Sequence, residues 1–443
     1  MKNPPLFFQR RFWPMWVTLS LGTFSDNVLR QALLIGVTYG AIKGFGGEGS
    51  DNALPFIGAL LPLAIMLFSP FAGKLADKYE TAAMFRRTKF TELILVIIAA
   101  LAFASGSGVL ALAMLFGMGA QSAFYAPVRL GAMPKYLEPN ELVRGNGLCN
   151  AGLFGFILMG YMVGGALIAE NNGGVKVGAV LIASSSFGFI ASLFAVEREA
   201  NDPAVKPDFN LFADIATMAR HALTARGVAP PLFGTAAFFC ISTAITIVTP
   251  LYARDALHGD AFTATILNGL FAIGAGIGAV GAASLSKGRS SLGFSTFAIG
   301  AAGLLTFAVL ALTPFAAPPP GEVFTPEDLF SKPAGLALAL IFITTSALMG
   351  VYVAPLQAAI QRRAPKATRA RILAASTFTN AAFAIPGSLS TAAITATGIP
   401  AAYAFPAAGV AMLAISALML HRRRTLPDGL FDEMLKESPV ASV

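Results

Sequence analysis

Twelve long apolar segments recur along the chain, and no other feature limits its possible folds as strongly. A helix needs roughly 17–25 mostly apolar residues to cross a bilayer, and every segment is of that order or longer. Charged residues make up only 12% of the 443 residues, whereas soluble domains carry roughly 25%. The sequence therefore predicts an all-α polytopic membrane protein, with helices at residues 12–42, 53–76, 88–105, 109–133, 147–169, 176–196, 229–253, 261–285, 291–313, 335–360, 372–396 and 399–420.

Lysine and arginine are distributed unevenly between the loops. If both termini lie in the cytoplasm, the basic clusters on that side are Arg10–Arg11, Arg86–Arg87–Lys89, Arg362–Arg363 and Arg422–Arg423–Arg424. The outer loops keep only Lys43, Lys176, Arg254 and Lys332. Cytoplasmic loops of membrane proteins carry an excess of Lys and Arg, so this asymmetry predicts the orientation. It also accounts for the net charge of +8, and no nucleic acid partner is expected.

Residues that bind metals or carry out catalysis are scarce. Cys149 and Cys240 fall inside apolar segments, and His221, His258 and His421 are far apart in the sequence. We therefore expect no disulfide, no metal site and no cofactor. The sequence also lacks a His-x-x-x-x-Asp acyltransferase pair and a G-x-x-x-x-G-K-[ST] phosphate-binding loop. These absences predict that the protein is not an enzyme and is not driven directly by ATP.

The longest polar interruption, at 197–227, divides the predicted helices into six and six. Its second part, 208–226, has the spacing of an amphipathic helix. The predicted organisation is an N-terminal six-helix bundle at 1–198, a cytoplasmic amphipathic linker at 199–228, a C-terminal six-helix bundle at 229–424 and a cytoplasmic tail at 425–443.

The two predicted bundles also resemble each other in sequence. Pro127 and Pro355 are 228 residues apart, and each is followed by a basic loop. An Asn-Ala pair comes next in both halves, beginning at Asn150 and at Asn380, 230 residues apart. Duplicated six-helix halves with a substrate site between them are a common plan of secondary transporters.

The first apolar segment carries four polar residues near its midpoint: Asp26, Asn27, Arg30 and Gln31. Each charged group costs about 2.5–3.5 kcal/mol at the centre of a membrane-spanning helix by insertion scales. Such a helix must face an internal cavity or a partner charge. Either Asp26 and Arg30, four residues apart, neutralise each other, or they belong to a site for a polar head group or an ion.

A second polar face is expected on the fourth helix. Gln121, Tyr125 and Arg129 are spaced four residues apart, so they share one side of the helix. Pro127 can bend the helix at this point. Arg129 either reaches the cytoplasmic interface or faces Asp26 or a substrate phosphate across a cavity, because a guanidinium binds phosphate through two hydrogen bonds.

Other polar residues inside apolar segments are weaker candidates for substrate binding. An interhelical hydrogen bond is the alternative for each of them. These further candidates are Asn27, Gln31, Asn146, Asn150, Tyr352, Gln357 and Asn380.

The loop between the second and third helices reads Gly73-Lys-Leu-Ala-Asp77-Lys78. A small residue at 73 permits close helix packing, and an acidic residue at 77 is favoured at the N-terminus of a neighbouring helix. These features predict a conformational latch formed by Gly73, Asp77, Lys78, Arg86 and Arg87, unless the charges serve only to set the orientation. The segment resembles the loop signature G-x-L-A-D-[RK] of the major facilitator superfamily, but Tyr79-Glu80 replaces the Gly-Arg expected next.

A narrower resemblance runs through the first half. The segment Phe24-Ser-Asp26-Asn27-Val-Leu-Arg30-Gln-Ala-Leu33 is similar to F-x-D-N-x-x-K-x-A-L of bacterial lysophospholipid transporters. Segments 75–79, 121–129 and 141–148 resemble the same family. Arg129 stands where that family has lysine, and Thr246 stands where it carries an intramembrane arginine.

The resemblance implies that lysophospholipids are flipped from the outer to the inner leaflet of a bacterial inner membrane and re-acylated inside. We also expect a monomer, with any acyltransferase a separate cytoplasmic partner. Pulling a tail of ~15 methylenes through water costs roughly 12 kcal/mol, so the tail should stay in apolar surroundings during alternating access. An exporter of another small amphiphile or drug is the alternative.

Overall fold

The computed structural model describes residues 5–42, 50–138, 141–200, 203–204, 210–224, 228–285, 292–363 and 369–425. Within these ranges the secondary structure is helical, and the one β-type pairing is an isolated bridge between Gly259 and Phe324. The prediction of an all-α protein is confirmed.

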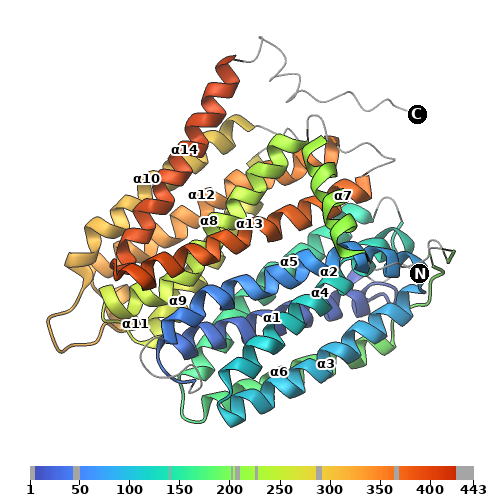
Figure 1. The fold of residues 1–443 in the computed structure, drawn as a ribbon, viewed down its shortest axis with the longest axis horizontal. Coiled ribbons are helices and arrows are strands. Elements are labelled where there is room, and N and C mark those ends of the chain that lie inside the picture. Colours follow the sequence, from blue (N-terminus) through green and yellow to red (C-terminus); the bar gives the residue numbers. More distant parts are fainter. Residues whose placement is uncertain are drawn as a thin grey trace. The chain divides into compact units, whose positions relative to one another are not determined.

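Twelve of the described helices have 21 residues or more (Figure 1). They are α1 (Trp13–Thr38), α2 (Leu54–Lys78), α3 (Thr81–Ser105), α4 (Gly108–Tyr136), α5 (Leu142–Ile168), α6 (Gly173–Leu193), α8 (Ala229–Leu251), α9 (Ala261–Leu285), α10 (Leu292–Ala316), α12 (Pro333–Arg363), α13 (Arg369–Thr397) and α14 (Ala404–Thr425). The shorter elements are η1 (Leu6–Phe8), η2 (Ser50–Ala53), α7 (Leu211–Thr224), the π-helix η3 (Tyr252–Ala256), α11 (Pro326–Ser331) and η4 (Ala401–Tyr403).

Eleven of the long helices are apolar enough to cross a membrane by length and composition, among the residues described. The remaining one is α1, which has 26 residues and therefore sufficient length. It is less apolar because the polar residues 26, 27, 30 and 31 interrupt its middle. The chain is a polytopic membrane protein, as predicted.

The chain divides into two compact units, Met1–Met218 and Ala219–Val443, with the division inside α7. In the first unit α1 packs on α5 and α6, α2 on α4, and α3 on α4 and α6. In the second unit α8 packs on α13 and α14, α9 on α12, and α10 on α12 and α14. Figure 1 shows α3 beside α6, and α10 beside α14. The helix pairing of the first unit is therefore repeated in the second, and Pro127 and Pro355 lie inside the corresponding helices α4 and α12.

The start of α3 differs from the prediction. The helix begins at Thr81, not at residue 88, because the Glu80 side chain accepts hydrogen bonds from the backbone N–H groups of Ala82 and Ala83, both at 2.7 Å. Such a cap satisfies the free donors of a first helical turn. The earlier start makes Lys89 part of the helix interior.

Close helix contacts depend on glycine at a few positions. At Gly164 of α5 an added Cβ would lie 2.5 Å from the backbone oxygen of Val28 on α1. At Gly278 of α9 it would collide with the backbone oxygen of Ala347 on α12. Small residues let helix backbones approach closely in membranes, and these two contacts fix the α1–α5 and α9–α12 pairs.

We expect Gly278→Val to destabilise the protein by about 1–3 kcal/mol, because the added side chain must push α9 and α12 apart. Thermal unfolding in detergent, followed by the fraction of monodisperse protein, measures the effect. Gly276→Val is the matched control on the same helix, since a Cβ there meets no described atom within 4 Å. Equal unfolding temperatures for the two variants would contradict the close contact.

Candidate functional site

A fully buried ion pair lies inside the N-terminal unit. On α3, Lys89 Nζ is 2.6 Å from Glu92 Oε2, and each side chain is 1% exposed. The sequence-based grouping of Lys89 with the cytoplasmic charges of Arg86 and Arg87 is wrong. A lysine and a glutamate three residues apart lie on one helix face, and this spacing inside an apolar segment is the signal that could have revealed the pair.

Glu92 is surrounded by hydrogen-bond donors. Besides Lys89, it accepts from Gln121 Nε2 of α4 at 3.1 Å and from Ser185 Oγ of α6 at 3.1 Å. Gln121 Nε2 also donates to the backbone oxygen of Thr88 at 3.1 Å. Gln121, predicted to line a cavity, is instead 5% exposed and holds α4 against α3.

The Lys89 ammonium group occupies space that a glycine of α1 leaves open, and it lies beside a second glycine on α6. An added Cβ would lie 2.6 Å from Nζ at Gly22 of α1 and 3.6 Å from it at Gly188 of α6. The ring centroid of Tyr125 on α4 is 5.3 Å from Nζ, within range of a cation–π interaction. The Tyr125 hydroxyl shares a 2.8 Å hydrogen bond with Thr18 of α1. Tyr125, another predicted cavity residue, is therefore committed to the core of the unit.

Asp26 accepts one hydrogen bond among the described residues and does not pair with Arg30. Its Oδ2 accepts from Ser122 Oγ of α4 at 2.6 Å. Its Oδ1 is buried and has no hydrogen-bond partner in the described structure. The charges that act on Asp26 are those of Lys89 and Glu92. Local neutralisation of Asp26 by Arg30, one of the two sequence-based alternatives, is not what the structure shows.

Two guanidinium groups in the same unit have no acidic partner among the described residues. Arg30 Nη1 donates to the Tyr161 hydroxyl of α5 at 3.4 Å, a long hydrogen bond. Arg129 is half-buried on α4, and its charge acts on Tyr125 and Cys149. Among the described side chains, neither guanidinium forms an ion pair with a carboxylate, and the predicted contact of Arg129 with Asp26 is not made.

The remaining candidates of the N-terminal unit differ in their hydrogen bonding. Asn27 Nδ2 donates to the backbone oxygen of Thr23 in its own helix at 2.7 Å. Gln31 is fully buried, and neither of its amide atoms has a partner within the described residues. The side chains of Asn146 and Asn150 lie outside the described part of the structure.

In the C-terminal unit, two candidates make hydrogen bonds between helices. The Tyr352 hydroxyl of α12 donates to the backbone oxygen of Gly234 at 2.9 Å, and Asn380 Oδ1 of α13 accepts from Thr235 at 3.1 Å. Both bonds tie their helices to α8.

The other two C-terminal candidates form no such bond between helices. Thr246 donates to the backbone oxygen of Ser242 at 2.8 Å in its own helix. Gln357 is exposed.

The residues of the predicted latch lie at the ends of α2 and α3. Arg86 is 3.4 Å from Glu197, and both side chains are exposed. The Arg87 guanidinium lies 4.9 Å and the Lys78 ammonium 5.8 Å from the ring centroid of Tyr79.

One further ion pair in this region was missed from the sequence. Lys74 Nζ donates to both carboxylate oxygens of Asp214 on α7, at 2.9 and 3.0 Å. At Gly73 an added Cβ meets no described atom within 4 Å, and Asp77 is exposed in the last turn of α2. The close packing predicted at Gly73 is therefore not made in the described structure.

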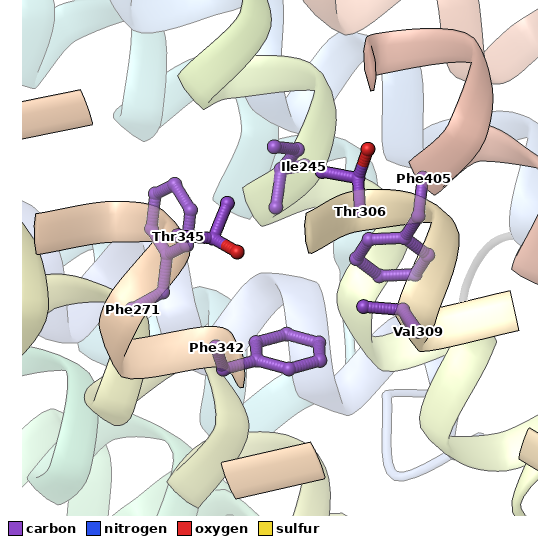
Figure 2. A pocket seen from close by; sticks show the side chains of 7 residues that line it. All are labelled: Ile245, Phe271, Thr306, Val309, Phe342, Thr345 and Phe405. Carbon is purple, nitrogen blue, oxygen red and sulfur yellow. The ribbon is translucent and has the colours of Figure 1, made fainter. Parts of the chain in front are cut away.

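A small apolar pocket lies in the C-terminal unit (Figure 2). Phenylalanine rings from α9, α12 and α14 surround it. The space inside it holds no more than about one water molecule, far less than the roughly 300–1,000 Å³ of ordinary ligand sites. The lining residues are Ile245, Phe271, Thr306, Val309, Phe342, Thr345 and Phe405. The pocket alone does not define a binding site.

Two units with the same helix pairing, both built from membrane-spanning helices, are typical of polytopic secondary transporters. The model of the Major Facilitator Superfamily matches residues 15–388. The chain belongs to this superfamily and is a transporter of its type.

Two curated relatives share part of the sequence. The Lysophospholipid transporter LplT of Cronobacter sakazakii is 27% identical over 176 residues, which cover 40% of this chain and 41% of the relative. The protein of the same name from Photorhabdus laumondii is 28% identical over 190 residues, covering 41% of this chain and 44% of the relative. The chain thus matches less than half the length of these relatives.

Solved structures support the fold alone. A POT family transporter in complex with 5-aminolevulinic acid has a TM-score of 0.70 at 14% identity, covering 94% of this chain and 96% of that one. A bacterial homologue of the iron transporter ferroportin, in an outward-facing state, has a TM-score of 0.56 at 14% identity, covering 92% and 100%.

We expect Lys89→Met to destabilise the protein by about 3–5 kcal/mol, because it leaves the Glu92 carboxylate buried without its counter-charge. The double variant Lys89→Met/Glu92→Gln should recover much of this loss, since no unpaired charge remains. Thermal unfolding in detergent compares the variants. Lys176→Met is the control, because its partner Glu170 is 42% exposed and surface pairs contribute about 0–1 kcal/mol. A double variant less stable than Lys89→Met would contradict this reading.

Proposed function

We propose that this protein is a secondary transporter that moves lysophospholipids from the outer to the inner leaflet of a bacterial inner membrane. Its membership of the Major Facilitator Superfamily supports the transport mechanism. The relatives named lysophospholipid transporters support the substrate class, although they match this chain only in part.

The observation that carries the proposal is the pair of guanidiniums on α1 and α4. Arg30 and Arg129 belong to the same unit, and neither has a carboxylate partner among the described side chains. A charged group inside a membrane protein is costly unless it pairs or lines a functional path. A phosphate diester supplies the missing charge, and guanidinium binds phosphate through two parallel hydrogen bonds.

The acyl tail needs a different environment from the head group. A tail of ~15 methylenes gains roughly 12 kcal/mol from apolar surroundings, and the polar groups found here are too few to compensate for its exposure. The tail therefore stays in contact with apolar side chains or lipid, while the head group passes the polar centre. Alternating access of the two units provides this movement.

Several further features belong to the same proposal. The proposed substrate-binding residues are Arg30 and Arg129 together with Asp26, Asn27, Gln31, Asn146, Asn150, Thr246 and Gln357. Gln121, Tyr125, Tyr352 and Asn380 hold their helices together in this structure and are not retained as substrate contacts. Gly73, Asp77, Lys78, Arg86 and Arg87 act as a conformational latch in another state of the cycle. Both termini lie in the cytoplasm, the protein acts as a monomer, and re-acylation is carried out by a separate cytoplasmic acyltransferase.

We expect Arg30→Ala and Arg129→Ala each to weaken lysophospholipid binding about 10- to 100-fold, because a hydrogen bond to a charged group contributes about 1.5–3 kcal/mol. Native mass spectrometry with lysophosphatidylethanolamine measures the affinity. Arg254→Ala is the control, since Arg254 is paired with Asp255 on the other unit. Wild-type affinity in both test variants would remove the two guanidiniums from the site.

Uptake into proteoliposomes separates the proposal from export of another amphiphile. Wild-type protein should take up labelled lysophosphatidylethanolamine and should not export cationic dyes. Dye export without lysophospholipid uptake would instead favour the second function.

A further inference from the structure

Among the described residues, the polar core of the N-terminal unit brings together two carboxylates and one ammonium group, whose charges do not balance. Two carboxylates, Asp26 and Glu92, share this region with one ammonium group, that of Lys89. We call these three residues the charge cluster. When all three are ionised the cluster carries one excess negative charge, which is expensive in an environment of low dielectric.

Within the charge cluster, the pair on α3 is a fixed element. The Glu92 carboxylate accepts three hydrogen bonds, from Lys89, Gln121 and Ser185, and both of its oxygens are used. Both members of the pair are 1% exposed. Removing either member of such a pair leaves an unpaired buried charge and is strongly destabilising. The pair is therefore a structural element, and Asp26 is the one member of the charge cluster that lies outside it.

Asp26 differs from Glu92 in its hydrogen bonding and in its exposure, and both properties matter for binding a proton. One of its oxygens, Oδ1, is buried without a hydrogen-bond partner in the described structure, whereas Oδ2 is held by Ser122. An ionised carboxylate with a buried, unpaired oxygen is unfavourable. The side chain as a whole is only half-buried, so water can reach it when a path opens.

The other ionisable groups around α1 do not neutralise Asp26. Arg30, one turn further along α1, is directed to Tyr161 of α5. Arg129 of α4 acts on Tyr125 and Cys149, and it is not among the charges that act on Asp26.

Two more helices packed on α1 have their charged residues at their ends. α6 has Lys176 in its first turn and serines further along, and α2 has its charged residues in its last two turns. The 3₁₀ turn η2, which also packs on α1, contributes Asp51.

We propose that Asp26 binds one proton in each transport cycle, with the Lys89–Glu92 pair as its fixed neighbour. The inference rests on the proposed transport function. The proton comes from water on one side of the membrane and forms an O–H bond at Oδ1, which makes the carboxyl group neutral. That bond breaks when the proton returns to water on the other side. Over one cycle Asp26 gains and loses one proton, so its charge and its number of hydrogen atoms return to their starting values.

A proton fits this site better than a metal cation does. Hard cations take several oxygen ligands, whereas Asp26 has the Ser122 hydroxyl, whose hydrogen it already accepts. No group of three or more His, Cys, Asp or Glu side chains among the described residues is placed to hold a metal ion.

Infrared difference spectroscopy of the purified full-length protein tests the inference without any substrate. Titration from acid to alkaline pH should remove one carbonyl band of a protonated carboxyl group, and this band should be absent from Asp26→Asn. Asp214→Asn is the matched control and should retain the band, because Asp214 is paired with Lys74. If Asp26→Asn does not fold, Ser122→Ala should shift the same band. A spectrum without a titrating carboxyl band would overturn the inference.

Transport by wild-type protein in proteoliposomes is the second test of proton binding by Asp26. A gradient of one pH unit, acid outside, should raise steady-state accumulation of labelled lysophosphatidylethanolamine up to about tenfold for one proton per substrate, and a sodium gradient should have no effect. Accumulation that follows sodium alone, or neither gradient, would overturn proton coupling and leave the proposed function intact. If no lysophospholipid moves under any gradient, the proposed function fails, while the infrared band still reports on Asp26.

Discussion

The ion pair between Lys89 and Glu92 organises the N-terminal unit. It is fully buried, and it draws donors from three helices to one carboxylate. Gly22 leaves the space that the end of the lysine side chain fills, because a Cβ there would lie 2.6 Å from Nζ. Because an unpaired charge at this depth costs several kcal/mol, the helices α1, α3, α4 and α6 can pack together only in the register that completes these contacts.

The two units share their helix pairing but differ in the chemistry of their cores. Among the described residues, the first unit contains a buried ion pair, a carboxylate with one unpartnered oxygen and two guanidiniums that form no ion pair. The second unit holds a small apolar pocket, and its predicted site residues Tyr352 and Asn380 are used in hydrogen bonds to α8. The two units thus share a scaffold, while among the described residues the buried ion pair and the carboxylate with an unpartnered oxygen lie in the first.

Apolar segment length predicted the helices well, because a bilayer demands a long apolar run wherever the chain crosses it. The expected helix at 261–285 coincides with α9. The predicted start of α3 lay seven residues after the observed one. Hydropathy does not record a cap such as the one that Glu80 forms through local hydrogen bonds. The short helix α11 was not predicted, because its capping box around Thr325 and Asp328 stabilises only six residues.

The candidate site was predicted less completely. Spacing placed Gln121 and Tyr125 on one helix face, but it could not show that the face meets α1 and α3 rather than a cavity. Lys89 follows two exposed arginines in the sequence, and it was therefore predicted to belong to their cytoplasmic cluster. Its ion pair with Glu92 makes it a core residue. Helical periodicity states which residues share a face, whereas the tertiary packing decides what that face contacts.

The most direct test of the account is a structure of the full-length protein in a lipid nanodisc with bound lysophosphatidylethanolamine. The account predicts phosphate density within hydrogen-bonding distance of Arg30 or Arg129, an intact Lys89–Glu92 pair, and an acyl tail in contact with apolar side chains or lipid. A phosphate bound elsewhere, with both guanidiniums paired to carboxylates of the protein, would contradict it.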